Sequence, residues 1–288
     1  HEELPWTELL AGTRAETILQ RDKVGLVNYY RSKGLQLMFM ADLTDGLDRA
    51  QEAPQLRALG RSIAEPAVQQ AYRSYVVAAA SLLRPEYLGL AAETNLIRVA
   101  APTLYPSVRQ AANAAAADLR AAAYAGTLMF SVQVETAWGR LGGNGPYVGI
   151  ATDRADFGFA QMLGLSSYPY FGHATPEDIP TDYYTRLQQG TVALPVMVVE
   201  GGWASAGVAP LSSSPALQAR YVTRHAALLD GVAARGLIQL VFADIDLAAF
   251  PPPVPPNLPL FATLGFVDSN YTPKPALAQW DALFARPR

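Results

Sequence analysis

The sequence contains no cysteine and only three histidines, at positions 1, 173 and 225. The absence of cysteine excludes a thiol nucleophile, a thiolate metal site and any disulfide bond. No two histidines have the spacing of a zinc motif, so we expect no metal and no other cofactor. A nucleophile elbow, a dinucleotide-binding glycine loop and a P-loop are also absent, and the corresponding enzyme classes therefore lack their usual signature.

Charged residues are scarce, at 16% of the chain, and 22 basic against 25 acidic residues give a formal net charge of -3. No Lys/Arg cluster is present that would neutralise phosphates, so nucleic acid is not an expected partner. No apolar run approaches the roughly 20 residues needed to span a bilayer, and the chain opens with polar residues, so no membrane association is expected. The compartment stays open, with secretion or the periplasm favoured, and so does the oligomeric state.

Half of the residues are hydrophobic, which suffices for one large core, and the length favours a single domain spanning 1–288. Short apolar segments predict buried strands, and longer stretches with helical patterns separate several of them. The predicted strands are 35–41, 87–93, 127–135, 162–166, 195–200 and 237–243. The predicted helices are 14–33, 62–83, 107–123, 215–235 and 275–285.

Strands that alternate with helices are typical of a parallel sheet, and we expect an α/β fold of the (β/α)8 TIM-barrel type. Such a barrel has eight strands, so the chain is expected to be N-terminally truncated and to lack the first one or two, with residues 1–6 at the mouth of the second. A native fold with fewer strands is the alternative. The proline-rich stretch 250–259 predicts a rigid loop over the barrel mouth.

Functional residues of parallel barrels lie where strands end and loops begin. Glu200 is the most distinctive residue in such a position, because it ends an all-apolar strand and precedes two glycines and Trp203. The glycines allow a sharp turn, and the tryptophan provides a flat platform. A carboxylate at the end of a buried strand must be solvated, paired or functional. A structural ion pair or a cap is the alternative role for Glu200.

Glu93 ends the predicted strand 87–93 and is followed by Asn95. Taken alone, this glutamate is equally compatible with an ordinary helix entry. With two strands missing in front, however, Glu93 ends strand 4 and Glu200 ends strand 7, at opposite sides of the barrel mouth. Two carboxyl groups that face each other across a cleft are what glycosidic cleavage requires, one as acid and one as nucleophile.

The chain resembles the clan A glycoside hydrolases, and within them the endo-β-1,4-galactanase family. The resemblance rests on the two glutamates, on SSYPY at 166–170, on EGGW at 200–203 and on GFVDSNYTPKPALAQW at 265–280. It implies a retaining hydrolase of β-glycosidic bonds in an oligo- or polysaccharide. By this resemblance Glu93 is the general acid/base, Glu200 is the nucleophile and Tyr168 lies near the position that holds the nucleophile.

Two positions depart from the family pattern. The family normally has an asparagine directly before the acid/base, where this chain has Ala92, with Asn95 two residues beyond the glutamate. The clan often supplies a tryptophan from strand 8, whereas here that strand ends with Asp244 and Asp246. The sugar and the linkage are therefore not carried over from the family.

The remaining strand-end residues are candidates for substrate binding. Aromatic rings can stack on sugars, and carboxylates and amides can bind hydroxyl groups. These candidates are Asn95, Asp42, Glu135, Trp138, Tyr170, Trp203 and Asp244. For the aromatic residues the alternative is ordinary packing, and for Glu135 it is an ion pair with Arg98 or Arg140. We also expect apolar neighbours to raise the pKa of Glu93 and hydrogen bonds to keep Glu200 ionised.

Two other functions remain open from the sequence. A non-catalytic glycan-binding barrel is suggested by Ala92 in place of the asparagine. A hydrolase of another bond, such as an ester, would need Ser166 or Ser167 within hydrogen-bond reach of His173, the loop histidine after strand 6. His225, in a predicted helix, is expected to be structural.

Overall fold

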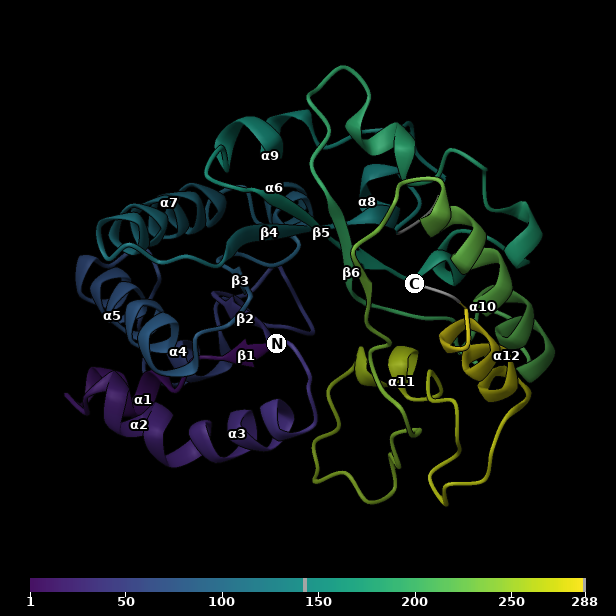
Figure 1. Cartoon of the computed structure of the whole chain (residues 1–288), viewed down its shortest axis with the longest axis horizontal. Helices are drawn as coiled ribbons and strands as arrows, with labels where there is room; N and C mark the ends of the chain where they lie inside the picture. Colours follow the sequence, from purple (N-terminus) through teal and green to yellow (C-terminus); the bar gives the residue numbers. More distant parts are fainter. Residues whose placement is uncertain (142–143, 287–288) are drawn as a thin grey trace. The chain divides into compact units, whose positions relative to one another are not determined.

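The structure is a computed structural model that describes residues 1–141 and 144–286. The strands form a seven-stranded sheet in which the spatial order is the sequence order (Figure 1). They are β1 (Glu2–Glu3), β2 (Met38–Asp42), β3 (Tyr87–Gly89), β4 (Thr127–Gln133), β5 (Met162–Ser167), β6 (Val196–Gly201) and β7 (Gly236–Leu237). The pairs β1–β2, β2–β3, β3–β4 and β6–β7 are parallel. This topology agrees with an incomplete (β/α) barrel. That further strands are missing stays a prediction.

The chain divides into two compact units. The first comprises residues 1–132 and 152–164, and the second comprises residues 133–151 and the chain from Leu165 onward. A single domain over 1–288 stays a prediction.

The helices of the first unit cover its strands with apolar faces. α5 packs against α2 and α7, and its buried residues include Val68, Tyr72, Val76 and Leu83, which recur at helical spacing. Pro66 begins α5 at a position where its missing N–H costs nothing. The helices are α1 (Trp6–Leu10), α2 (Ala15–Asp22), α3 (Val24–Ser32), α4 (Pro54–Ala58), α5 (Pro66–Leu83), α6 (Thr94–Ala100), α7 (Tyr105–Ala121) and α9 (Ala151–Asp156).

The second unit has a core around α10 and α12, in which Val222, Phe266 and Ala276 pack together with Trp280 beside them. Ser214 caps the start of α10, because its side chain accepts a hydrogen bond from a backbone amide of the first turn. The helices here are α8 (Val134–Ala137), α10 (Pro215–Asp230), α11 (Leu258–Phe261) and α12 (Pro275–Phe284), and the 3-10 turns are η1 (Pro169–Phe171), η2 (Pro176–Asp178) and η3 (Thr185–Gln188).

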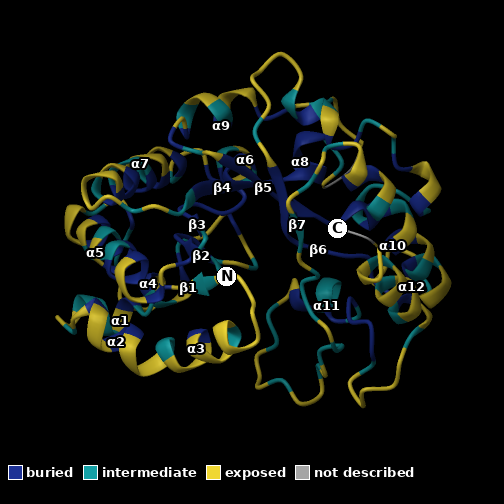
Figure 2. Cartoon of the chain, in the orientation of Figure 1, coloured by how far each residue is buried: buried dark blue, intermediate teal, exposed yellow. Residues whose placement is uncertain are grey.

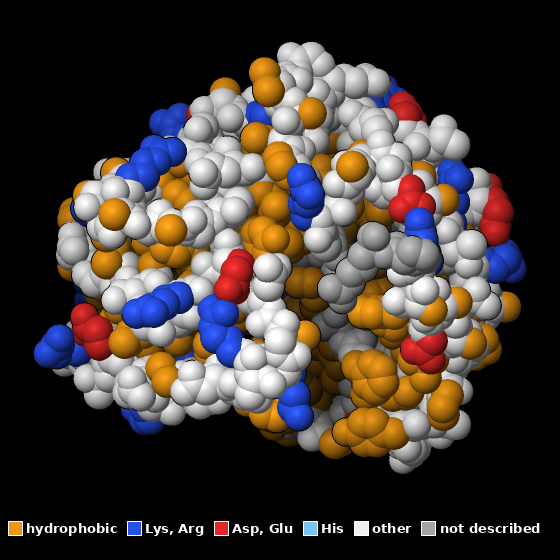
Figure 3. Space-filling view, in the orientation of Figure 1, with side chains coloured by type: hydrophobic (Ala, Val, Ile, Leu, Met, Phe, Trp, Pro, Cys, Tyr) orange, Lys and Arg blue, Asp and Glu red, His pale blue; other side chains and the backbone are white. Residues whose placement is uncertain are grey.

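Burial follows the pattern that the sequence predicted for covered strands. Every residue of β5 and β6 is buried, whereas the outer faces of the helices are exposed (Figure 2). On the face drawn in Figure 3, Lys and Arg side chains are dispersed among the others and form no single patch. Within the described ranges, no helix combines the length and the apolar character needed to cross a membrane.

The six predicted strands are confirmed, and two of them are clearly shorter than predicted. The strand expected over 87–93 covers only Tyr87–Gly89, so Glu93 lies beyond its end. The last strand was expected over 237–243 but covers only Gly236–Leu237. The predicted helix 14–33 is interrupted at Lys23, whose ammonium binds Glu2 at 2.7 Å, and so forms two helices. Residues 250–259 are irregular until α11 begins at Leu258. The short helices α4, α6 and α9 were not predicted, because a few residues show no clear helical period.

Candidate functional site

Glu200 occupies the fifth position of β6, and its neighbours fix the carboxyl group. The Ser166 hydroxyl, on β5, donates a hydrogen bond of 2.7 Å to Oε1 of Glu200. The residue is buried, with 9% of its surface exposed, so the carboxyl group is not freely solvated. A hydrogen bond to a carboxylate favours its ionised form, which suits the nucleophile predicted from the sequence.

The two glycines after Glu200 are required by close packing. A Cβ on Gly201 would lie 2.4 Å from the backbone oxygen of Ser167. Gly202 has a φ of 152°, and a Cβ there would lie 2.7 Å from the side chain of Gln239. The amide of Gly202 donates to the oxygen of Ser167 at 3.2 Å. The turn predicted from the sequence is therefore present, and it attaches the end of β6 to the end of β5.

The aromatic candidates of the second unit are buried and in contact with one another. Trp203 is 1% exposed, and its indole N–H donates to Ser213. Trp138 stacks on Tyr183 at 5.2 Å and donates to its backbone oxygen. Tyr170 donates to a backbone oxygen of α11. Packing, the alternative that the sequence left open, describes these three residues, and sugar stacking by them would require them to move.

Tyr168 follows β5 directly and is 3% exposed. Its ring contacts those of Phe171 and Phe261 at 5.7 and 5.1 Å between centroids. Its backbone amide donates to the carboxyl group of Glu135. The predicted role of Tyr168 in holding the nucleophile stays a prediction.

Glu135 lies in α8 and is completely buried. The Tyr183 hydroxyl donates to its carboxyl group at 2.8 Å, the Gln133 amide at 2.5 Å and the Ser167 hydroxyl in a longer contact of 3.4 Å. Burial raises the pKa of Glu135 to about 7, against the lowering effect of these hydrogen bonds. Neither arginine expected as an ion-pair partner takes that place, because Arg98 binds Asp153 and Arg140 binds Asn144. Direct substrate contact by Glu135 would require the tyrosines to move.

Glu93, in the first unit, immediately precedes α6 and has a φ of 47°. This left-handed conformation costs a non-glycine residue about 1–2 kcal/mol, and such strain is often found at functional sites. The amide of Glu93 donates to the Ser131 hydroxyl of β4 at 2.9 Å. The neighbouring strand β4 therefore contacts the backbone of Glu93, which lies four residues beyond the end of β3 at Gly89.

Arg49 connects Glu93 with Asp42. Its Nε donates to Oε2 of Glu93 at 2.8 Å, and its Nη1 donates to Oδ2 of Asp42 at 2.6 Å. All three residues are buried. The apolar environment expected around Glu93 is thus replaced by a guanidinium, which favours an ionised carboxylate. Asp42, predicted to bind substrate, is engaged in the same buried cluster, and Asn95 is 1% exposed within α6.

Asp244 holds loops of the second unit together. Its carboxylate lies 2.5 Å from the Lys274 ammonium and accepts from the amide of Gly265 at 2.9 Å. Lys274 also donates to Ser205. This arrangement matches the loop-capping alternative for Asp244, and its binding of sugar hydroxyls stays a prediction.

The serine and histidine side chains do not form the pair that an ester hydrolase would need. The Ser166 hydroxyl donates to Glu200, and the Ser167 hydroxyl pairs with that of Tyr184 at 2.9 Å. Nε2 of His173 is buried without a hydrogen-bond partner among the described residues. His225 is buried in α10, as expected for a structural residue. The two serine hydroxyls thus form hydrogen bonds with carboxyl groups and a tyrosine, and these contacts do not support an ester hydrolase.

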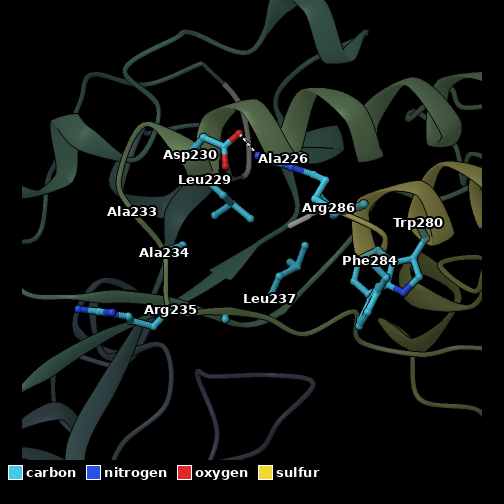
Figure 4. Close-up of a pocket in the computed structure, with 12 residues that line it drawn as sticks. Ala226, Leu229, Asp230, Ala233, Ala234, Arg235, Leu237, Trp280, Phe284 and Arg286 are labelled. Carbon is cyan, nitrogen blue, oxygen red and sulfur yellow. Dashed lines mark hydrogen bonds and ion pairs between the residues drawn. The ribbon is translucent and has the colours of Figure 1, made fainter. Parts of the chain in front are cut away.

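Two hollows lie at the amino ends of the strands, away from these residues. One, of about 450 Å³, is lined by Leu237 of β7, by Trp280 and Phe284 of α12 and by the Asp230–Arg286 ion pair (Figure 4). The other, of about 620 Å³, is bordered by the segments that precede β3 and β4. This end of a barrel contributes to stability and not to chemistry. Among the described residues, no group of three or more His, Asp or Glu is arranged to hold a metal ion.

Sequence reasoning missed Arg49, Ser131 and Tyr183 as neighbours of the candidate acids. Arg49 was detectable in principle, because it is a basic residue in the acidic loop that follows β2. Ser131 and Tyr183 carry no local signal, since each reaches its glutamate from a distant part of the chain. Glu93 belongs to the first unit and Glu200 to the second, and that the two carboxyl groups face each other stays a prediction.

Comparisons with known proteins give a likeness of fold. No family model matches the sequence, and no curated protein matches it. Similar solved structures include a GH2 β-galacturonidase from Eisenbergiella tayi bound to galacturonate, with 14% identity, a TM-score of 0.57 and coverage of 99% of this chain and 49% of that chain. A β-D-glucuronidase from Dictyoglomus thermophilum shares 10% identity with a TM-score of 0.58, over 99% and 48%. A β-glucuronidase from Ruminococcus gnavus shares 12% identity with a TM-score of 0.55, over 91% and 43%.

The chain thus spans less than half the length of these three similar proteins. At such identities the likeness concerns the fold alone. The chain shares its fold with parts of these glycoside hydrolase structures, whereas the resemblance to endo-β-1,4-galactanases is not confirmed by them.

Proposed function

We propose that this chain is a retaining glycoside hydrolase that cleaves β-glycosidic bonds of an oligo- or polysaccharide. Glu200 is the nucleophile and Glu93 the general acid/base. The observation that carries the proposal is the setting of Glu200, a carboxyl group at the end of a buried strand that is held by Ser166 at 2.7 Å and followed by two sterically required glycines. Hydrogen bonding pre-organises a nucleophile for attack, because no reorganisation is needed during the reaction.

The proposed reaction has two steps. Ionised Glu200 attacks the anomeric carbon while Glu93 donates a proton to the leaving oxygen. In the second step Glu93 accepts a proton from water, which releases the sugar from Glu200. Retention of configuration requires the two carboxyl groups to stand about 5–5.5 Å apart in the active protein, whereas inversion requires roughly 6.5–9.5 Å.

The buried cluster around Arg49 sets a condition on this mechanism. An acid that donates a proton in the first step must be protonated, and the guanidinium 2.8 Å away favours the charged form. Substrate binding must therefore weaken the Arg49–Glu93 ion pair before the first step. A sugar hydroxyl that takes over one of the Arg49 hydrogen bonds would do this.

A glycan-binding protein without catalysis is the second candidate, and the same ion pair favours it. If Arg49 keeps Glu93 charged in the complex with sugar, the carboxylate can bind hydroxyl groups but cannot act as an acid. The sequence also has Ala92 where the endo-β-1,4-galactanase family normally has an asparagine, and this difference favours the second candidate as well.

The test is a screen of chromogenic β-glycosides and polysaccharides with the parent protein and with the Glu200→Ala and Glu93→Ala variants. The panel includes aryl β-glucuronide and β-galacturonide, because similar structures are named for these sugars, and β-1,4-galactan. We expect turnover by the parent, loss of at least about 1,000-fold in Glu200→Ala and first release of the β-anomer in an NMR time course. Full activity in Glu200→Ala would refute the assignment. Sugar binding without turnover by the parent would favour the second candidate.

A further inference from the structure

Two consecutive serines at the end of β5 each contact a carboxyl group. Ser166 donates to Glu200 at 2.7 Å, and Ser167 contacts Glu135 at 3.4 Å. Successive residues of a strand point to opposite faces of the sheet, so the two carboxyl groups are reached from the two faces. The strand end is therefore a physical connection between Glu135 and Glu200.

Two backbone hydrogen bonds strengthen this connection. The amide of Tyr168 donates to the Glu135 carboxyl group, and the oxygen of Ser167 accepts from the amide of Gly202. Gly201 also packs against the Ser167 oxygen so tightly that a Cβ would overlap it. A displacement of the Ser167–Tyr168 peptide would thus move both the Ser166 hydroxyl and the turn after Glu200.

The groups around Glu135 can all donate hydrogen bonds to it. They are the hydroxyls of Tyr183 and Ser167, the side-chain amide of Gln133 and the backbone amide of Tyr168. An ionised carboxylate accepts from all four, and charge-assisted hydrogen bonds are roughly twice as strong as neutral ones. A protonated carboxyl group must instead donate one bond, and a hydroxyl such as that of Tyr183 must turn to accept it.

We infer that Glu135 is a positioning residue for the nucleophile: in its ionised form it fixes the Ser167–Tyr168 peptide and thereby the Ser166 hydroxyl that orients Glu200. This inference rests on the proposed function of Glu200. Glu135 is completely buried, and its effect is exerted through β5 and not through contact with a substrate.

The charge state of Glu135 changes within the ordinary pH range, because burial raises its pKa to about 7. Burial keeps the pKa of each neighbouring tyrosine above its ordinary value and lowers the pKa of the two nearby histidines, so all are neutral near pH 7; they are Tyr170, Tyr183, Tyr184, Tyr221, His173 and His225. The nearby cations have other partners, Arg140 with Asn144 and Arg186 with the rings of Trp138 and Tyr147.

The experiment compares kcat and KM of the parent and of Glu135→Gln between pH 5.5 and 8 on the best substrate of the screen. Glutamine has the size of glutamate but never ionises, so it reproduces the protonated state. We expect equal kcat at pH 5.5, a kcat about tenfold lower than the parent at pH 8, and KM within twofold throughout. A purely structural role would lower kcat by the same factor at every pH and would overturn the inference. Glu177→Gln, at an exposed glutamate paired with Arg220, is the matched control and should follow the parent.

A second variant covers the case in which Glu135→Gln does not fold. Tyr183→Phe removes one donor to the carboxylate, so the acid limb of the kcat profile should shift to higher pH. An unshifted limb contradicts the inference.

A readout without turnover separates this inference from the proposed function. In protein labelled with ¹³C at the glutamate carboxyl carbons, the Glu200 resonance should show an inflection near pH 7 that disappears in Glu135→Gln. If the parent hydrolyses no glycoside but shows this inflection, the proposed function fails and the connection between the residues stands. If the parent is active and the inflection is absent, the connection fails and the function stands.

Discussion

Tyr184 connects two buried ionisable residues, Glu135 and His225. Its hydroxyl bonds the Ser167 hydroxyl that contacts Glu135, and its ring lies 5.7 Å from the imidazole of His225. Burial raises the pKa of Glu135 to about 7 and lowers that of His225 to about 3. Burial thus disfavours the charged form of both residues, so that Glu135 ionises only near pH 7 and His225 becomes protonated only near pH 3.

These two shifts predict opposing effects of pH on the free energy of unfolding. Glu135 binds a proton more tightly when folded, so its contribution is complete below the unfolded pKa of about 4.5 and is lost as the pH rises to about 7. His225 binds a proton less tightly when folded, so its contribution is complete above about 6.5 and is lost as the pH falls towards 3. Each changes stability by about 1.4 kcal/mol per pH unit, with opposite sign.

Between pH 4.5 and 6.5 the two slopes cancel in the parent protein. In urea unfolding, the free energy of unfolding of Glu135→Gln should therefore rise by about 3 kcal/mol from pH 4.5 to 6.5, relative to the change in the parent. That of His225→Phe should fall by about 3 kcal/mol over the same window. Parallel pH curves for all three proteins would show that neither residue carries the shift assigned to it.

The Ser166 hydroxyl is predicted to contribute to both catalysis and stability. Hydrogen bonds to charged groups contribute about 1.5–3 kcal/mol, so Ser166→Ala should lower kcat by roughly 10- to 100-fold and should also lower the urea midpoint. Ser74→Ala, which removes a hydroxyl on the exposed side of α5, is the control and should keep full kcat. An unchanged kcat in Ser166→Ala would show that Glu200 is oriented without it.

The sequence predicted the strands and the strand-end position of Glu200 because these depend on local pattern. A short apolar run is consistent with a buried strand, and β5 and β6 match their predicted ranges closely. The last strand was shorter than predicted, since residues 238–243, which are apolar apart from Gln239, form no ladder. Apolar composition alone does not specify strand pairing.

The partners of the acids were not predictable in the same way. Tyr183 reaches Glu135 from 48 positions along the chain, and Arg49 reaches Glu93 from 44 positions away. Such contacts depend on loop conformation, which has no hydrophobic period to reveal it. The expectation of an apolar environment for Glu93 followed from its neighbours in sequence, and the buried guanidinium replaces that environment through the fold.

Arg49 is predicted to be essential for the stability of the first unit. Removing one partner of a buried ion cluster leaves uncompensated charge, which costs about 3–5 kcal/mol. The free energy of unfolding of Arg49→Met, measured in urea at pH 7, should therefore be lower than that of the parent by this amount, because Asp42 and Glu93 lose their ion-pair partner Arg49. The matched control is Arg109→Met, which breaks a largely exposed ion pair with Asp156 and should cost at most about 1 kcal/mol. Equal losses in both variants would contradict the burial argument.

Gly201 provides a steric test of the connection between β5 and β6. A Cβ at this position would lie 2.4 Å from the Ser167 oxygen, and because that atom is backbone, the strand end itself must shift. Gly201→Ala should therefore cost about 1–3 kcal/mol in stability and lower kcat further, since the displaced peptide carries the Ser166 hydroxyl away from Glu200. Gly25→Ala is the matched control, because a Cβ in that helix meets nothing within 4 Å and alanine favours helix by up to about 1 kcal/mol. A Gly201→Ala protein with the kcat of the parent would mean that Glu200 keeps its orientation when the end of β5 is moved, and the steric connection would then have no part in catalysis.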